Sequence, residues 1–517
     1  MRPRWMSTMW AARATWGPRG AIACALLALV AWSFWQRWQL LTASPFPLGV
    51  DGYFYPIELR ALLTRGELAY PASPLAFYLL APFAAATDPI TGAKLGAALW
   101  GAAIAVPACG VGARLGGGRG AGLLAAALAT TSVGSAYLTV EFVKNGIGLT
   151  VGLGALWAVL AACDRPTRLR LAAAAAGLLA AWGTHKMAAA MVMVIAIPAA
   201  LAAATAHGRL RGRRLIYALA AVVAAGLAAL TVGMLAPRRF LSIDDAALLR
   251  GLFSTTPRWT APALGFPGGE LSVGHDALLG LAVGLVAVAL LLRRRARGAP
   301  AGPSATSPAA AAAAWPILAL AIAIGLPLLA VSDREGLGFR LRLAAFVPAA
   351  LAAAVLARAA LGRWVHRDRA LVAAAAVLAL VRRPGDRLDG EIVTHPALVT
   401  AAEALRGRVP PDATLIVPER HIAFLVAWYT GADVAIRPES VPPARRYRLL
   451  PLHFIVADSP LDRALLAARA EPSLIPPLGL HPSHPDGMVL VAEPTWDWIV
   501  ARLPAADRAR CRAWPTL

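Results

Sequence analysis

The chain has 517 residues, a formal net charge of +22, 58% hydrophobic residues and only 15% charged residues. Soluble globular proteins usually carry about 25% charged residues, so the composition excludes an ordinary soluble enzyme, and its hydrophobicity excludes disorder. It predicts a polytopic membrane protein. The positive charge can indicate nucleic acid, anionic lipid, or only the orientation of membrane loops.

Eleven apolar stretches predict membrane-spanning helices, because a span needs about 20 mostly apolar residues. They lie near 20–42, 92–112, 120–138, 145–162, 171–184, 187–206, 215–236, 276–292, 312–331, 341–361 and 370–381. The first follows four arginines and has no small-residue cleavage site, so we interpret it as a retained anchor.

The segment 43–91 is predicted to be the first outside loop. Pro56 can begin a helix there, with Tyr55 and Leu59 on one face and Glu58 on another, which predicts an amphipathic interfacial helix. The apolar residues 74–86 are too few to span and predict a second short helix.

The basic residues identify the orientation of the spans. Six alternate connections contain 20 basic and two acidic residues, so they account for 18 of the 22 net positive charges. These connections are 1–20, 113–120, 163–170, 207–214, 293–311 and 362–369. Cytoplasmic loops carry such an excess. We therefore expect a cytoplasmic N-terminus, a periplasmic C-terminus and no nucleic-acid partner. All but three of the 50 basic residues are arginines, a bias typical of GC-rich bacteria, which indicates a bacterial inner membrane.

The residues after the last predicted span have a different character. Strands are expected at 413–418, 433–438, 452–458 and 487–494, and helices at 419–431 and 459–470, the former closed by Gly431. The sequence thus predicts two domains, an α-helical transmembrane domain over 1–381 and a small extracytoplasmic α/β domain over 382–517.

Ionisable side chains at the outer ends of the predicted spans form the candidate site, because such groups are costly in a membrane and mark function. They are Asp51, Lys94, Glu141, Lys144, His185, Lys186, Arg340 and Arg342, and Tyr55 joins them as a substrate contact. A carboxylate can take a proton from an acceptor hydroxyl, and cations can hold a phosphate. These residue types predict a site for a lipid phosphate.

The same residues have structural interpretations. Asp51 and Gly52 form a good turn dipeptide, and Glu141 and Lys144 fit a simple ion pair at a helix end. The other cations can reach the headgroups or anchor a helix at the interface, and Tyr55 fits an aromatic belt.

The loop sequence GVDGYFYPIELRALLTRGELAYPASPLAFYLLAPF (49–83) resembles the first outside loop of the GT-C integral-membrane glycosyltransferases, which use polyprenyl-phosphate-linked sugars. Segments 92–131, 142–149 and 183–187 are also similar to parts of that superfamily, which includes protein mannosyltransferases, aminoarabinose transferases and oligosaccharyltransferases. The resemblance implies a GT-C-like fold of about 11 transmembrane helices, with juxtamembrane helices in the first outside loop.

It also implies a hexosyl- or pentosyltransferase. Asp51 matches the proposed catalytic base of the superfamily, and Glu141 matches a second loop carboxylate. The outer cations would contact the donor phosphate, and a lipid, glycan or protein would be the acceptor. If a divalent metal (Mg²⁺ or Mn²⁺) takes part, Asp51 and Glu141 are its expected ligands. Asp51 is followed by Gly52 rather than by a second acid, and this departure leaves metal dependence and substrate open.

Two other classes of function remain open from the sequence. One is a transporter or flippase for a lipid-linked or anionic solute, which would use the outer charges as a binding site. The other is a catalytically silent scaffold whose tail binds an envelope partner.

Overall fold

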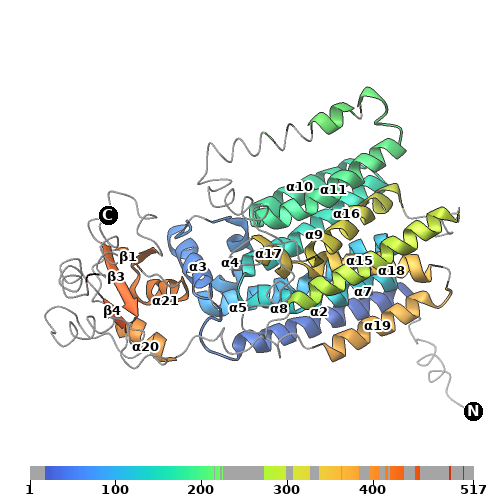
Figure 1. Ribbon diagram of the computed structural model, residues 1–517. Helices are drawn as coiled ribbons and strands as arrows, with labels where there is room; N and C mark the ends of the chain where they lie inside the picture. Colours follow the sequence, from blue (N-terminus) through green and yellow to red (C-terminus); the bar gives the residue numbers. More distant parts are fainter. Residues whose placement is uncertain are drawn as a thin grey trace, which may run out of the picture. The chain divides into compact units, whose positions relative to one another are not determined.

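In the computed structural model, the described residues are 18–49, 51–70, 72–214, 216–221, 224, 227, 273–297, 307–326, 337–362, 364–382, 396–404, 406, 414–416, 420–435, 449–454, 488–490 and 505. Most of them are helical (Figure 1). The predicted helix over 459–470 and most of the span over 215–236 lie outside the described residues.

The chain is a helical, multi-pass membrane protein. Within the described ranges, six helices are long and apolar enough to span a membrane, and a bent pair of shorter helices gives a seventh candidate. The six are Gly20–Thr42, Pro89–Gly116, Val143–Asp164, Lys186–Ala206, His275–Ala296 and Pro308–Gly325. The larger number of eleven stays a prediction.

The chain divides into two compact units. Unit 1 contains residues 1–40, 71–76 and 96–389, and unit 2 contains residues 41–70, 77–95 and 390–517. Most of the first-loop segment thus groups with the C-terminal residues, whereas the sequence placed it with the transmembrane domain.

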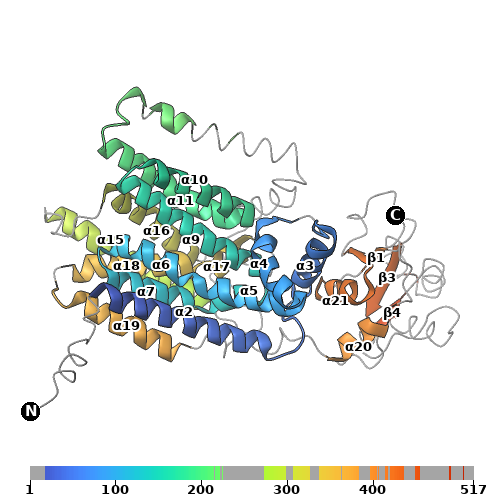
Figure 2. The same cartoon turned by 180° about the vertical axis from the view of Figure 1, so that it is seen from behind.

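Unit 1 is a bundle of helices. Its members are α2 (Pro18–Thr42) and α5 (Pro89–Ala103), which both cross the unit boundary, α6 (Ala105–Gly116), α7 (Arg119–Thr130), α8 (Val133–Val140), α9 (Val143–Asp164), α10 (Arg168–Thr184), α11 (Lys186–Ala206), α15 (Val273–Ala296), α16 (Pro308–Gly325), α17 (Leu337–Leu343), α18 (Phe346–Leu361) and α19 (Arg367–Val381). The helices α2 and α19 lie side by side in both views (Figures 1 and 2), and Trp32 Nε1 donates to Ala379 O at 2.9 Å.

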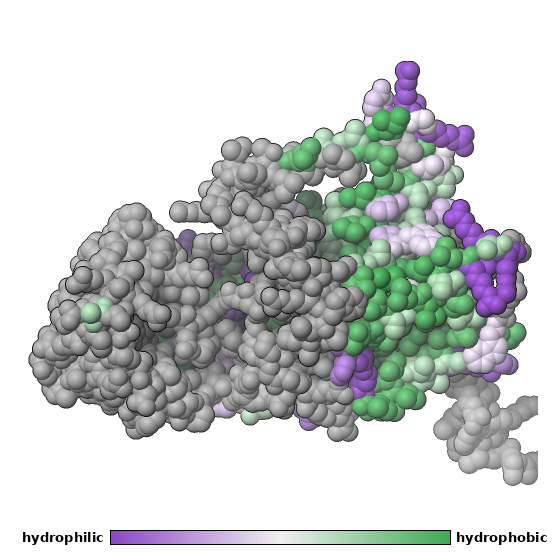
Figure 3. Space-filling model, viewed as in Figure 1, coloured by the Kyte–Doolittle hydropathy of each residue, from purple (hydrophilic) through white to green (hydrophobic). Residues whose placement is uncertain are grey.

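Apolar residues cover the surface of unit 1 seen in Figure 3, as expected of helices that face lipid. Hydrophilic residues gather at one edge of that surface. The last turn of α15 carries Arg293, Arg294 and Arg295, in a connection that the sequence places inside.

Small residues allow the helices of unit 1 to pack closely. The core where α2, α6, α7 and α19 meet consists largely of alanines. A Cβ added at Gly116 would lie 2.2 Å from Ala121 Cβ and 3.1 Å from Ala354 O, so α6 approaches both α7 and α18 there. Close backbone approach of this kind stabilises helix pairs in membranes, where no hydrophobic force acts between helices.

A break separates α7 from α8, and the two helices meet at 50°. The hydroxyls of Thr130 and Thr131 donate to the carbonyls of Ala126 and Ala127, a back-bonding pattern that bends helices. Ser132 then caps α8, since its Oγ accepts the Ser135 N–H at 3.0 Å. The sequence Thr-Thr-Ser therefore ends one helix and begins the next.

Unit 2 contains the first-loop helices and short strands. Its helices are α3 (Phe54–Arg65), most of α4 (Leu75–Ala86), α20 (Pro396–Ala404) and α21 (Arg420–Thr430), and its strands are β1 (Thr414–Ile416), β2 (Asp433–Ala435), β3 (Leu449–Phe454) and β4 (Met488–Leu490). The strand order is β2-β1-β3-β4; β1 pairs parallel with β2 and β3, and β4 pairs antiparallel with β3.

The strands lie in or overlap the segments expected from the sequence. α21 ends at Gly431, whose φ of 72° is the left-handed conformation that glycine favours, and the Gly431 N–H donates to Ala427 O. A complete α/β domain over 382–517 stays a prediction, because much of that range lies outside the described residues.

We expect Gly116→Ala to destabilise the protein by about 1–3 kcal/mol, because the added methyl group overlaps Ala121. Thermal unfolding in detergent measures this. Gly154→Ala in α9 is the matched control, since nothing lies within 4 Å of its added Cβ. The control should be neutral or slightly stabilising, as glycine weakens a helix interior. Equal effects of the two substitutions would contradict close packing at Gly116.

Candidate functional site

Four of the predicted site residues lie near two helix junctions of unit 1. Glu141 follows α8 at the α8–α9 junction, is 3% exposed, and its N–H donates to Tyr137 O. Lys144 and Asn145 lie in the first turn of α9. His185 joins α10 to α11, and Lys186 is the first residue of α11.

The two junctions lie at the same end of the bundle, here named the junction end. A Cβ added at Gly148 would be 2.6 Å from His185 Cβ, so the absence of a side chain in α9 lets the α10–α11 junction approach. Lys144 is four residues before Gly148 and shares its helix face. Lys144 is therefore about one turn from the point where His185 contacts α9.

The helix α17 brings the two predicted arginines to the junction end. The centroid of the Phe339 ring lies 6.4 Å from the centroids of the Tyr137 and Phe142 rings. The Tyr137 and Phe142 centroids are 6.0 Å apart. Arg340 and Arg342 follow Phe339 on α17. The aromatic contacts thus place these cations beside the α8–α9 junction.

Arg342 is a buried cation, 2% exposed. Its Nη2 donates to Leu326 O at 3.4 Å, while its Nε and Nη1 have no partner within the described part of the chain, and neither does Arg340 Nε. Buried polar groups are nearly always hydrogen-bonded, and an exception marks a functional candidate. A planar guanidinium with spare donors is suited to a phosphate or carboxylate.

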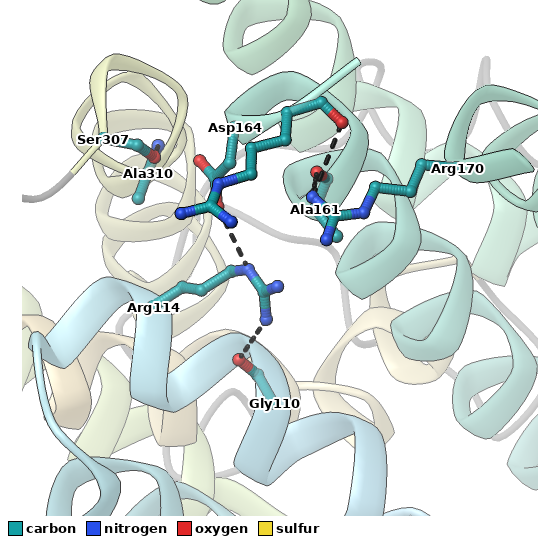
Figure 4. Close-up of polar contacts among 8 residues, drawn as sticks. Gly110, Arg114, Ala161, Asp164, Arg170, Ser307 and Ala310 are labelled. Carbon is teal, nitrogen blue, oxygen red and sulfur yellow. Dashed lines mark hydrogen bonds and ion pairs between the residues drawn. The ribbon is translucent and has the colours of Figure 1, made fainter. Parts of the chain in front are cut away.

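The opposite end of unit 1 has its own charged cluster, shown in Figure 4. Arg114 Nε lies 3.4 Å from Asp164 Oδ2, and Arg114 Nη1 donates to Gly110 O. Arg170 Nη1 donates to Ala161 O. The donors of this cluster contact backbone carbonyls of α6 and α9 and the Asp164 carboxylate, so cations lie near the C-terminal ends of these two helices, where a positive charge is stabilising.

In unit 2, Asp51 lies in a tight turn directly before α3 and is 5% exposed. Gly49 has a φ of 88° and accepts the Gly52 N–H, and Asp51 O accepts the Phe54 N–H, both at 3.0 Å. A Cβ at Gly52 would be 2.4 Å from Leu48 O. Two glycines therefore allow the turn that buries the carboxylate of Asp51.

Lys94 supports the chain before this turn. Its Nζ donates to Ser44 O at 2.7 Å and to Pro45 O at 3.2 Å, and the residue is 8% exposed. These bonds fit the structural interpretation, in which Lys94 holds the start of the first loop. Its contact with a substrate stays a prediction.

Aromatic side chains pack around the start of α3. The Phe54 ring lies 5.1 Å from Phe424 and 5.7 Å from Phe77, and the Tyr55 ring lies 6.1 Å from Phe77. Tyr55 is 4% exposed, so it belongs to this aromatic core rather than to an exposed belt.

The helix α21 contacts α3 directly. Arg60 Nη1 donates to Trp428 O at 3.1 Å, and the Arg60 guanidinium carbon lies 4.1 Å from the centroid of the Trp428 ring. The Tyr53 ring lies 6.4 Å from Trp428 and 6.0 Å from Tyr429. Burial raises the pKa of the Tyr53 hydroxyl above its ordinary value. C-terminal residues thus help to hold the helix that follows Asp51.

Glu58 departs from the sequence-based expectation. The helical pattern placed it on the polar face of an interfacial helix, but it is fully buried. Its carboxylate accepts the N–H groups of Ala69 at 2.7 Å and Tyr70 at 2.9 Å. These bonds fix the segment that follows α3.

The predicted residues thus fall into two sets. Unit 1 contains Glu141, Lys144, His185, Lys186, Arg340 and Arg342 at its junction end, and unit 2 contains Asp51, Tyr55 and Lys94. Three further ionisable residues are buried, Arg37, Glu58 and Asp276; the sequence pattern placed Glu58 on a polar face and did not single out the other two. An ionisable residue inside an apolar run was a usable signal for Arg37 and Asp276.

The described residues contain no group of three or more His, Cys, Asp or Glu side chains that could hold a metal ion. The predicted metal ligands, Asp51 and Glu141, belong to different units. Their role as metal ligands stays a prediction.

The sequence matches no protein-family model and no curated protein. A functional proposal for the chain accordingly rests on its own residues and their geometry.

We expect Glu58→Gln to loosen the segment after α3. The carboxylate accepts one N–H group with each oxygen, whereas an amide has a single oxygen, so its NH₂ group would face the second N–H donor. A hydrogen bond to a charged group is worth about 1.5–3 kcal/mol. Trypsin cleavage after exposed Arg65 should become faster in native protein. Glu67→Gln, at an exposed glutamate of the same segment, should leave cleavage unchanged. Equal cleavage of the two variants would rule out this role.

Proposed function

We propose that the protein is a membrane glycosyltransferase that moves a sugar from a polyprenyl-phosphate donor to an acceptor hydroxyl at the outer face of the bacterial inner membrane. The observation that carries the proposal is the junction end of unit 1, where a buried arginine with spare donors accompanies Glu141, Lys144 and His185. Cations at this position suit a donor phosphate near the membrane surface.

The reaction follows from the chemistry of the groups. Asp51 accepts the proton of the acceptor hydroxyl, and the acceptor oxygen forms a bond to the anomeric carbon of the sugar. The bond from that carbon to the phosphate oxygen breaks, and its electron pair leaves with the polyprenyl phosphate. Attack in line with the leaving group inverts the anomeric configuration. Lys144, Lys186 and Arg342 stabilise the charge that develops on the leaving phosphate.

The arrangement around Asp51 supports its role. The Asp51 side chain is buried, with 5% of its surface exposed. The turn held by Gly49 and Gly52 and the helix α3 fix its backbone, and Lys94 fixes the preceding chain. Pre-organisation of this kind lowers the cost of aligning a base with its substrate.

A transporter for an anionic solute is the second candidate function, and the break between α7 and α8 favours it. Broken helices often form the binding sites of secondary transporters. The polar groups at this break bond mainly to one another, however, so they leave few free for a solute. Reconstituted vesicles separate the two functions, because a transporter moves the lipid-linked sugar without transferring it.

Asp51→Asn should lower kcat for sugar transfer by about 10²- to 10⁴-fold, because the amide cannot accept the proton. The measurement is transfer of labelled sugar from polyprenyl phosphate in proteoliposomes. Asp88→Asn is the control. Asp88 accepts the N–H groups of Ile90 and Thr91 at the start of α5, and asparagine preserves this cap. Undiminished transfer by the Asp51 variant would remove the assigned base.

Arg342→Gln should raise the KM for the donor about 10- to 100-fold, because a charged hydrogen bond contributes about 1.5–3 kcal/mol. Competition by polyprenyl phosphate should weaken in parallel. Arg114→Gln removes a cation at the opposite end of unit 1 and should leave both values unchanged. Asp333 and Glu335 precede α17 in the sequence. If D333N or E335Q reproduced the Arg342 effect, an internal carboxylate would be its partner instead of the donor.

A further inference from the structure

The break between α7 and α8 is surrounded by ionisable side chains that the proposed reaction does not use. Arg37 of α2 is 2% exposed and Asp276 of α15 is 3% exposed. Both lie in helices long and apolar enough to span the membrane, where a buried charge is costly and needs a function.

Arg37 uses all five of its N–H donors within the protein. Its Nε donates to Thr139 Oγ1 at 3.2 Å, and its Nη1 donates to the carbonyl and hydroxyl of Ser33. Its Nη2 donates to Thr130 O at 3.0 Å and to Ser135 Oγ at 2.7 Å. A guanidinium has five donors, so this one has none left for a ligand. Its role is therefore to join α2 to both sides of the break.

Asp276 serves the other side of the break. Its Oδ2 accepts the Ser132 hydroxyl at 2.9 Å and the Gly134 N–H at 3.3 Å, and its Oδ1 lies 3.8 Å from Arg382 Nη2. Ser132 and Gly134 are the cap and a first-turn residue of α8. The carboxylate thus binds the beginning of α8.

The two charges match the dipoles of the broken helix. The carboxyl end of a helix attracts a cation, and its amino end attracts an anion. Arg37 contacts the last residue of α7, and Asp276 contacts the first turn of α8. Each charge therefore stabilises the helix end that the break exposes.

Close packing leaves little freedom at the break. A Cβ added at Gly101 would lie 2.6 Å from Thr139 Oγ1 and 2.7 Å from Arg37 Nε. A Cβ added at Gly134 would lie 2.4 Å from Leu343 O, at the end of α17. The start of α8 is therefore fixed against the helix that carries Arg340 and Arg342.

We propose that Arg37 and Asp276, at the two sides of the α7–α8 break, are positioning residues that set the direction of α8 and hence the place of Glu141. This inference rests on the proposed function, which takes the junction end, where Glu141 lies, as the site of the donor phosphate. The eight residues of α8 span about 12 Å, so a change of about 10° in the bend would move its end by about 2 Å. A displacement of about 1 Å can lower a rate about 100-fold.

The test uses full-length protein in lipid nanodiscs with the variants R37K, D276N and the milder S135A/T139V, which removes only two acceptors of Arg37. Hydrogen–deuterium exchange of the amides in 131–141 should increase at least about 10-fold in each. Exchange in 150–162 of α9 should stay at the wild-type level. Asp164→Asn, which removes the acidic partner of Arg114, is the control and should not alter exchange in 131–141.

The kinetic readout separates positioning from substrate binding. The variants should lose about 10- to 100-fold in kcat for sugar transfer, while the KM for the donor changes less than about threefold. Unchanged exchange in 131–141, or an even increase across all helices, would overturn the positioning role. Wild-type protein without sugar transfer would instead overturn the proposed function, and the exchange measurements would still decide whether the two charges fix α8.

Discussion

The break between α7 and α8, with Arg37 on one side and Asp276 on the other, is the constraint on which the arrangement of unit 1 depends. A helix that stops within a membrane exposes carbonyl and N–H groups that lipid cannot satisfy, and each costs several kcal/mol. Here the Thr130 carbonyl is bound by Arg37, and the Gly134 N–H is bound by Asp276. Neighbouring helices therefore supply the partners that make the break tolerable.

The break determines what the junction end contains. It starts α8 at a new angle, and α8 carries Tyr137 and leads into Glu141. Tyr137 then contacts Phe339 of α17, which brings Arg342 to the same end. The elements that carry Glu141 and Arg342 are thus held by a serine cap, two buried charges and an aromatic contact.

The first loop shows a similar dependence on distant residues. Asp51 lies in a turn that local glycines permit, but α3, which follows it, is held by Arg60 on Trp428 and by Tyr53 beside Tyr429. The C-terminal segment is therefore part of the unit that carries Asp51. Glu58 illustrates the same point, since its helix position predicted exposure and its tertiary bonds to Ala69 and Tyr70 bury it.

The sequence by itself determined the class of the protein, because helices in lipid require long apolar runs, and these are visible in the order of its residues. It also determined the first-loop helices, the cap at Gly431 and the candidate residues from Asp51 to Arg342. Only the tertiary structure decided which of these residues meet, since contacts such as Gly148 with His185 join positions that no local pattern relates. The roles of Arg37, Glu58 and Asp276 were decided there too, because a buried charge is defined by the partners that distant helices and loops bring to it.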